Sequence, residues 1–126
     1  MSSAPLEIEG IRICIMRDPR IYNRRLREFE REYGRPMYDL SLKALAPSTD
    51  LKNGFKRKVI SWEEYVPKFG REVLRKQKEL IAFLAQVAMS QNITLLCGEK
   101  TPDRCHRRLV AEECKKYQPR LEVIIQ

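Results

Sequence analysis

The sequence has few of the residues on which several common classes of protein depend. It contains one histidine, one tryptophan and five glycines, and it has neither a glycine-rich phosphate loop nor a dinucleotide-binding fingerprint. Its apolar runs are shorter than the roughly 18 to 20 residues that cross a bilayer. The opening MSSAPLEIEG carries two acidic residues and lacks the basic start and apolar stretch of a secretion signal. We therefore expect a cytoplasmic protein with no membrane partner.

The balance of residue types is that of a folded, globular protein. Of the 126 residues, 43% are hydrophobic and 33% are charged. A chain of this length has enough apolar surface for a core of its own and little room for a second domain. We expect a single domain over residues 1–126, with residues 1–9 flexible.

Positive charge is in excess and unevenly distributed. The formal net charge is +8. Such a field attracts phosphate-bearing partners, including nucleic acids. The alternative is a solvated, salt-bridged helix, because Glu28, Glu30 and Glu32 interleave with the basic residues. Seven arginines lie within nineteen residues: Arg17, Arg20, Arg24, Arg25, Arg27, Arg31 and Arg35.

The hydrophobic pattern of the first two thirds of the chain predicts strands alternating with helices. Strands are expected over residues 11–16 and 37–45, and helices over residues 22–33 and 71–89. Ser48 and Asp50 are helix-start or turn residues. A further helix should begin after Ser61, because Ser61 and Glu64 have the spacing of a capping box.

The last third of the chain predicts a strand, a helix and a strand. Residues 93–97 are almost wholly apolar, which is typical of a central parallel strand. Thr101 should cap a helix that runs to about Tyr117, with Pro102 at its first position. Residues 121–125 then supply a final strand. We expect an α/β fold, a single three-layer-type domain with a mostly parallel sheet flanked by helices.

The segment between Cys97 and Arg108 carries the residues best suited to chemistry. Ligands bind open α/β sheets at the carboxyl ends of the strands, beside helix N-termini whose free amides favour anions. Arginines in the first turn of a helix oppose its dipole, a cost that is accepted where a site needs the charge. We predict that Thr101, Arg104 and Arg107 bind an anion.

Three residues of this segment are candidate catalytic groups. Cys97 would be a nucleophilic or redox-active thiol, because helix N-termini and cations favour the thiolate. His106 would be a general acid or base, and Glu99 could act as an acid or base or merely balance the arginines. The alternatives are a buried, hydrogen-bonded histidine and a cysteine that only fills the end of a strand. Cys105 could pair with Cys97 under oxidation, or simply pack.

The cysteines also raise the question of a metal. Cys105 and Cys114 lie nine residues apart on one predicted helix, about 13.5 Å in rise, so they cannot share one zinc ion. A smaller site with Cys97, His106 and a distant residue remains open. We predict no metal and no other cofactor.

The same residues resemble the signature of the family called domain of unknown function 488. The resemblance rests on LLCGEKTPDRCHRRLVAEE, on YDLSLKALAPSTDLKNGFK and on ISWEEYVPKFGREVL, and it covers about residues 11–113. It implies an α/β protein of bacterial and archaeal cytosol, and no known reaction. Carried over residue by residue, its signature comprises Cys97, Glu99, Cys105, His106 and Arg107, while Asp39 and Ser48 belong to the upstream motif.

Three functional hypotheses follow. The first is an enzyme-like crevice that binds a phosphate-bearing small molecule, a nucleotide or a nucleic-acid end through the Cys, His and Arg residues. The second is a non-catalytic, basic nucleic-acid-binding protein. The third is an interaction or regulatory module whose signature is only structural. The sequence does not determine whether the protein is an enzyme.

Overall fold

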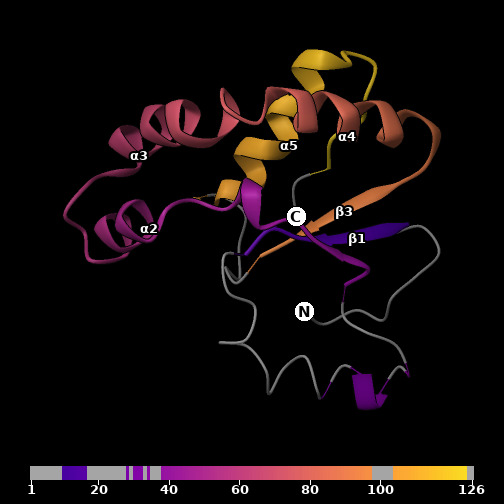
Figure 1. Ribbon diagram of the computed structural model, residues 1–126, viewed down its shortest axis with the longest axis horizontal. Helices are drawn as coiled ribbons and strands as arrows, with labels where there is room; N and C mark the ends of the chain where they lie inside the picture. The colour runs from indigo at the N-terminus through magenta and orange to yellow at the C-terminus, as the bar shows by residue number, and fades with distance from the viewer. Residues whose placement is uncertain are drawn as a thin grey trace.

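A three-stranded parallel sheet lies at the centre of the molecule. The computed structural model describes residues 10–16, 28, 30–32, 34, 38–97 and 104–124. Strands β1 (Ile11–Cys14), β2 (Leu40–Ser41) and β3 (Ile93–Leu96) are arranged in the order β2-β1-β3 (Figure 1). Both neighbours of β1 run parallel to it. The predicted α/β fold with a parallel sheet flanked by helices is confirmed.

The strand at the centre of this sheet is β1. Ile13 pairs with Leu40 of β2 on one side and with Leu95 of β3 on the other. Ile13 and Cys14 are at most 1% exposed, whereas within β3 only Leu96 is buried. The prediction that residues 93–97 form the central strand is therefore wrong, because an apolar run fixes neither how deeply a strand is buried nor how many neighbours it has.

Helices α2 to α5 lie on one side of the sheet (Figure 1). Helix α5 packs against both α4 and β3. None of the helices in the described part of the chain is long and apolar enough to span a membrane. The helical elements are the 3₁₀ turn η3 (Lys43–Leu45), α2 (Thr49–Lys56), α3 (Trp62–Phe69), the π-helical turn η4 (Gly70–Leu74), α4 (Lys78–Ser90) and α5 (His106–Tyr117).

Local capping starts α2 and α3. The Ser61 hydroxyl accepts from the Glu64 amide at 3.2 Å, and the Glu64 carboxylate accepts from the Ser61 amide at 3.1 Å. This is the predicted capping box, and it is confirmed. The Ser48 hydroxyl accepts from the Leu51 amide at 3.1 Å, so Ser48 is a helix-start residue as expected.

Two of the predicted elements are interrupted. The expected strand over residues 37–45 is reduced to β2, because the chain turns into η3 and buries Leu45 completely. The expected helix over residues 71–89 begins as the π-helical turn η4, where the Arg75 amide donates to the Gly70 carbonyl at 2.9 Å. Helix α4 starts only at Lys78, since the wider turn breaks the α-helical hydrogen-bond pattern.

The last predicted elements also differ. Helix α5 begins at His106, not near Thr101, and its N-cap Cys105 has extended backbone. Residues 121–124 form no strand, so the predicted strand-helix-strand unit over residues 93–125 is wrong. The Lys115 ammonium donates to the carbonyls of Pro119 and Leu121, which holds this segment at the end of α5.

Two expectations fall wholly or partly outside the described residues. Of the helix expected over residues 22–33, residues 28 and 30–32 are helical. Residues 1–9, which we expected to be flexible, are not among those described.

The core joins the sheet to the helices that cover it. Its members are apolar side chains from β1, η3 and the helices, each less than 9% exposed. Burial of this size supplies most of the driving force for folding. The core consists of Ile13, Ile15, Leu45, Leu51, Tyr65, Phe69, Val73, Ile81, Leu84 and Val110.

Candidate functional site

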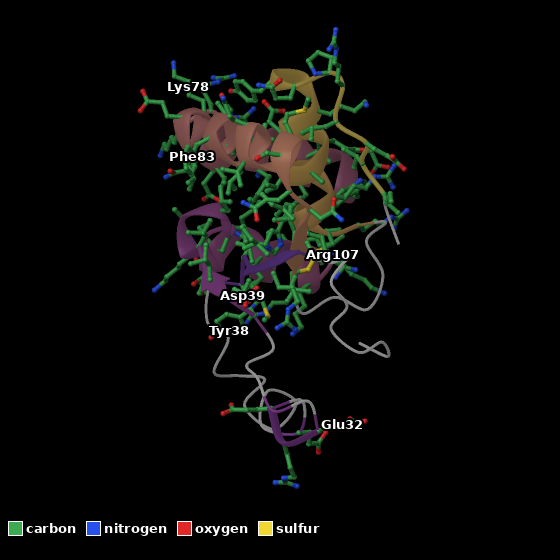
Figure 2. The ribbon with its side chains drawn as sticks, turned by 90° about the vertical axis from the view of Figure 1, so that its right-hand side faces the viewer. Glu32, Tyr38, Asp39, Lys78, Phe83 and Arg107 are labelled. Atoms are coloured by element: carbon green, nitrogen blue, oxygen red, sulfur yellow. A yellow bond between two sulfur atoms is a disulfide. The ribbon has the colours of Figure 1, made fainter. Side chains whose placement is uncertain are left out.

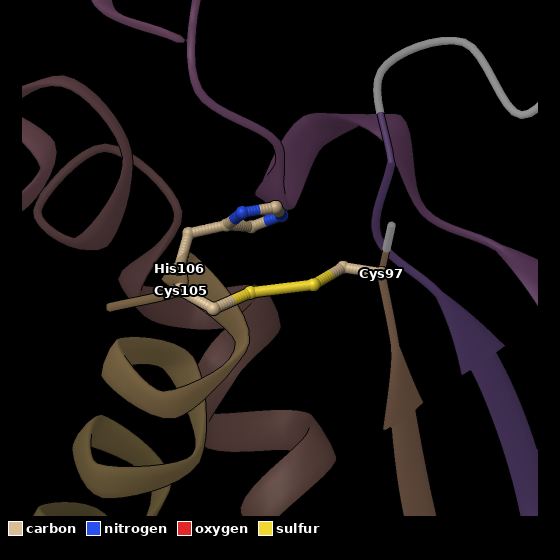
Figure 3. Close-up of side chains that lie close together, drawn as sticks. All are labelled: Cys97, Cys105 and His106. Atoms are coloured by element: carbon tan, nitrogen blue, oxygen red, sulfur yellow. A yellow bond between two sulfur atoms is a disulfide. The ribbon is translucent and has the colours of Figure 1, made fainter. Parts of the chain in front are cut away.

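A cluster of two cysteines and the single histidine lies at the carboxyl end of β3. Cys97 directly follows this strand, Cys105 is the N-cap of α5, and His106 is the first residue of α5 (Figure 3). The sulfur atoms and one ring nitrogen of the histidine all lie within 4.8 Å of one another. The predicted meeting of Cys97 with His106 is thus present, at the sheet edge where open α/β proteins bind ligands.

The two cysteines of this cluster form a disulfide (Figure 3). Their Cα atoms are 8.0 Å apart and eight residues apart in sequence. Cys97 is partly exposed, whereas Cys105 is only 2% exposed. Cys97 is therefore the more accessible residue of the pair.

The imidazole of His106 is fixed by a hydrogen bond to β1. Its Nε2 lies 2.8 Å from the Ile15 carbonyl oxygen. A carbonyl only accepts hydrogen bonds, so in the neutral ring Nε2 carries the hydrogen and Nδ1 carries the lone pair. The side chain is 9% exposed. Hence the fold specifies which ring nitrogen is available to a partner.

The same surroundings keep His106 uncharged. Burial lowers its pKa, the Ile15 carbonyl opposes that change, and the positive charges of Arg107 and Lys52 lower the pKa further, to about 4. At neutral pH the ring is therefore a neutral hydrogen-bond partner. The general acid or base role expected for His106 calls for a pKa near the working pH, which these surroundings do not provide.

An unbroken series of aromatic contacts leads to the histidine. Phe69 of α3 lies against His106 with ring centroids 5.8 Å apart, and Tyr65 stacks on Phe69 at 5.8 Å. Tyr65 in turn stacks on Trp62 at 5.1 Å and contacts Phe55 at 5.2 Å. Rings in such arrays restrict one another's orientation. The α2–α3 pair thus forms one wall of the cluster.

The predicted anion-binding residues are only partly within the described chain. Arg107 is partly buried, its positive charge acts on His106, and its place on α5 is shown in Figure 2. Arg104 is exposed just before the helix. Thr101 and Glu99 lie outside the described residues. Lys52 of α2 adds a cation that the sequence gave no reason to select, because it comes from a distant turn of the chain.

The two residues of the upstream motif have contacts of their own. The Asp39 carboxylate accepts from the Arg12 amide at 2.9 Å, three residues before Ile15 on the same chain segment. Ser48 caps α2, and its amide donates to the Glu72 carboxylate at 3.0 Å. These bonds tie β2 and α2 to the sheet and to η4. They do not link Asp39 or Ser48 to the cysteine cluster.

Comparison with known protein families agrees with the family resemblance of the sequence. The family model DUF488-N3a, described as the active DUF488-N3 subclade, matches residues 2–118. The chain belongs to the DUF488 family. No curated protein and no solved structure matches it. For this DUF488 protein, function therefore has to be argued from the cluster itself.

Proposed function

We propose that this DUF488 protein is a thiol-dependent enzyme whose reaction centre is the Cys97–Cys105 pair. The observation that carries the proposal is the close pairing of a partly exposed cysteine with a buried one at the carboxyl edge of the sheet. An exposed attacking thiol next to a shielded second thiol is the arrangement of redox-active cysteine pairs. The description of the subclade as active supports an enzyme.

The reaction is thiol–disulfide exchange. In the reduced protein, the Cys97 thiolate attacks one sulfur of a substrate disulfide and expels the first substrate thiolate, which takes up a proton. The Cys105 thiolate then attacks the Cys97 sulfur and expels the second. The substrate gains two electrons and two protons, and the protein pair becomes the disulfide found between Cys97 and Cys105. An external dithiol returns the pair to its reduced form.

His106 is proposed to position the pair. Held by Ile15 and Phe69, its neutral ring lies beside the two sulfurs, with one ring nitrogen within 4.8 Å of them, and the lone pair of Nδ1 can accept a hydrogen bond. With a pKa of about 4, it does not store a proton at neutral pH. We infer that it orients a thiol hydrogen and leaves proton exchange to solvent.

The substrate is proposed to be an anionic disulfide, with a phosphate-bearing small molecule that carries the disulfide as its natural class. Lys52 and Arg107 place positive charge beside the cluster, and Arg104 is exposed next to it. Oriented cations at a helix N-terminus favour phosphate and carboxylate groups. Glu99 and Thr101 remain predicted members of the same site.

Nucleic acid is the alternative partner. The described part of the arginine-rich segment, which includes Glu32, lies across the sheet from α2–α5 and away from Arg107 (Figures 1 and 2). In this alternative, nucleic-acid binding would not depend on the cysteine cluster. Its binding would weaken steeply with salt and would be unchanged in Cys97→Ser.

The decisive test compares two thiol variants during reduction of an aromatic disulfide. Cys97→Ser should slow the exchange at least about 100-fold, because the exposed attacking group is lost. Cys105→Ser should instead accumulate a mixed disulfide on Cys97, seen by mass spectrometry of the intact protein. Cys114→Ser is the matched control and should react like the wild type, since Cys114 lies elsewhere.

The charge of the probe tests the substrate class. Dithiobis(nitrobenzoate), which is anionic, should react faster with the wild type than neutral dithiodipyridine does. The ratio of these two rates should fall in Arg107→Gln. An unchanged ratio would remove the anion proposal. Equal reactivity of Cys97 and Cys114 would remove the reaction centre itself.

A further inference from the structure

We propose that the reduced cluster also binds a thiophilic divalent cation, with Zn²⁺ as the expected ion. Its ligands would be the sulfurs of Cys97 and Cys105 and Nδ1 of His106. The proposal goes beyond thiol–disulfide exchange, because it needs only the reduced thiols. If both hold, the cation masks the attacking thiol and so regulates the same site.

The first support is the distance between candidate ligand atoms. The two sulfurs and a ring nitrogen all lie within 4.8 Å of one another. Zinc bonds of about 2.0–2.3 Å place tetrahedral ligand atoms roughly 3.3–3.8 Å apart, so on reduction the two sulfurs would separate slightly while the ring nitrogen stays beside them. No other group of three or more such ligands was found among the described residues.

The second support is the span of the backbone. The Cα atoms of Cys97 and Cys105 are 8.0 Å apart, whereas disulfides usually span about 4.4–6.8 Å. An ion bound between two thiolates holds the sulfurs farther apart than an S–S bond does. The Cα atoms that it bridges can therefore also lie farther apart. The end of β3 and the start of α5 are thus already placed for the longer of the two bridges.

The third support is the hydrogen bond behind the histidine. Ligating histidines generally donate their other ring N–H to a carboxylate or a backbone carbonyl, which fixes the tautomer and the ring plane. The Ile15 carbonyl meets that requirement at 2.8 Å from Nε2. Phe69 holds the ring from the side. The imidazole is therefore oriented before any ion arrives.

The electrostatics are also suitable. Cys105 is the N-cap of a twelve-residue helix, and its side chain makes no capping hydrogen bond. A thiolate there is favoured by the helix dipole. Two thiolates cancel the charge of a divalent cation, so the bound cluster is neutral beside Lys52 and Arg107. With three protein ligands, the fourth position is left for water or a substrate atom.

The test is metal binding by the reduced, chelator-treated full chain under anaerobic conditions. Co²⁺ is added first as a spectroscopic probe, and Zn²⁺ then competes for the same site. We expect one ion per chain, with the thiolate-to-cobalt charge-transfer absorption of a site that has two sulfur ligands. Cys97→Ser should weaken binding about 10-fold or more and reduce that absorption by about half. Cys114→Ser is the matched control and should bind like the wild type.

His106→Gln tests the nitrogen ligand. This substitution should weaken metal binding but leave the charge-transfer absorption of both sulfur ligands in the cobalt spectrum. Circular dichroism of the metal-free variant checks that the variant is folded. Should that variant unfold, Cys97→Ser decides alone, because Cys97 is partly exposed. Absence of charge-transfer absorption in the wild type, or equal binding by Cys97→Ser, would overturn the proposal.

The two proposals for the cluster fail in different ways. Zinc binding without disulfide exchange removes the proposed reaction and keeps the metal site. Exchange by a protein that binds no metal removes the metal site and keeps the reaction. If both hold, one equivalent of Zn²⁺ should slow alkylation of Cys97 and leave that of Cys114 unchanged.

Discussion

The four cysteines divide into two pairs with different surroundings. Cys97 and Cys105 meet at the sheet edge beside the histidine. Cys14 is completely buried within β1, and Cys114 faces α4, where its thiol donates to the Ile81 carbonyl at 3.8 Å. Burial raises the pKa of Cys14, and it raises that of Cys114 to about 11, with the Glu113 charge adding to the effect. Position in the fold, and not residue type, therefore governs how readily a thiol ionises.

The largest expected effect concerns His106, the neighbour of the first pair. Its pKa is about 4 when folded and 6.5 when exposed, so between these values only the unfolded chain binds the proton. Stability is therefore complete above pH 6.5 and decreases by about 3 kcal/mol as the pH falls to 4. Urea unfolding across this range measures it.

The control for that prediction is His106→Gln, which keeps a donor for the Ile15 carbonyl and does not titrate. The protein has one histidine, so the difference between the two pH profiles isolates this residue. Identical profiles for variant and wild type would show that His106 is not the buried neutral group described above.

The next effect is a difference in alkylation rate within the reduced protein. With a pKa of about 11, Cys114 is about one thousandth thiolate at pH 8. We expect iodoacetamide to modify Cys97 at least about 100-fold faster than Cys114, as followed by peptide mass spectrometry. A ratio near one would abolish the distinction between the pairs.

A smaller effect concerns the free energy of unfolding, to which a cysteine of the buried pair should contribute more than Cys97. In reduced protein, Cys14→Ala should cost about 1–2 kcal/mol of unfolding free energy, because the lost sulfur leaves a gap in a fully buried strand. Cys97→Ala should cost less than about 1 kcal/mol, since that side chain is partly exposed. Thermal unfolding of both variants measures the difference, and a more destabilising Cys97→Ala would assign that residue a structural role.

The smallest effect tests whether the cysteine cluster depends on the stability of helix α3. Ser61→Ala removes one half of the capping box of α3 and should cost about 1 kcal/mol. The alkylation rates of Cys97 and Cys114 should stay the same, because folded molecules keep the cluster intact. Faster alkylation of Cys97 in this variant would mean that α3 and Phe69 hold the cluster more loosely than the ring contacts indicate.

Predictions from sequence succeeded where the cause was local. The alternation around Ile13, the apolar run that ends at Leu96 and the capping box at Ser61 all depend on neighbouring residues. The meeting of Cys97 with His106 was also predictable, because a strand end and a following helix start lie at the same edge of a parallel sheet. The family resemblance that the sequence carries pointed to the same residues.

Predictions failed where distant contacts prevailed over local signals. Thr101 and Pro102 have the pattern of a helix start, yet α5 begins at His106. Cys105 has the extended backbone usual for an N-cap, and the ring of His106 is held by Ile15, 91 residues away. Residues 121–124 form no strand for a more local reason, since Lys115 of α5 donates to the carbonyls of Pro119 and Leu121.

By itself, the sequence determined the α/β class, the capped start of α3 and the segment in which reactive residues gather. These follow from periodicity, capping and short-range connection, which act over a few residues. Only the tertiary structure decided which thiols pair, which nitrogen of His106 is available, and that Lys52, Phe69 and the Ile15 carbonyl surround the cluster. Burial and hydrogen bonding between distant segments control those properties, and neither is encoded in the spacing of neighbouring residues.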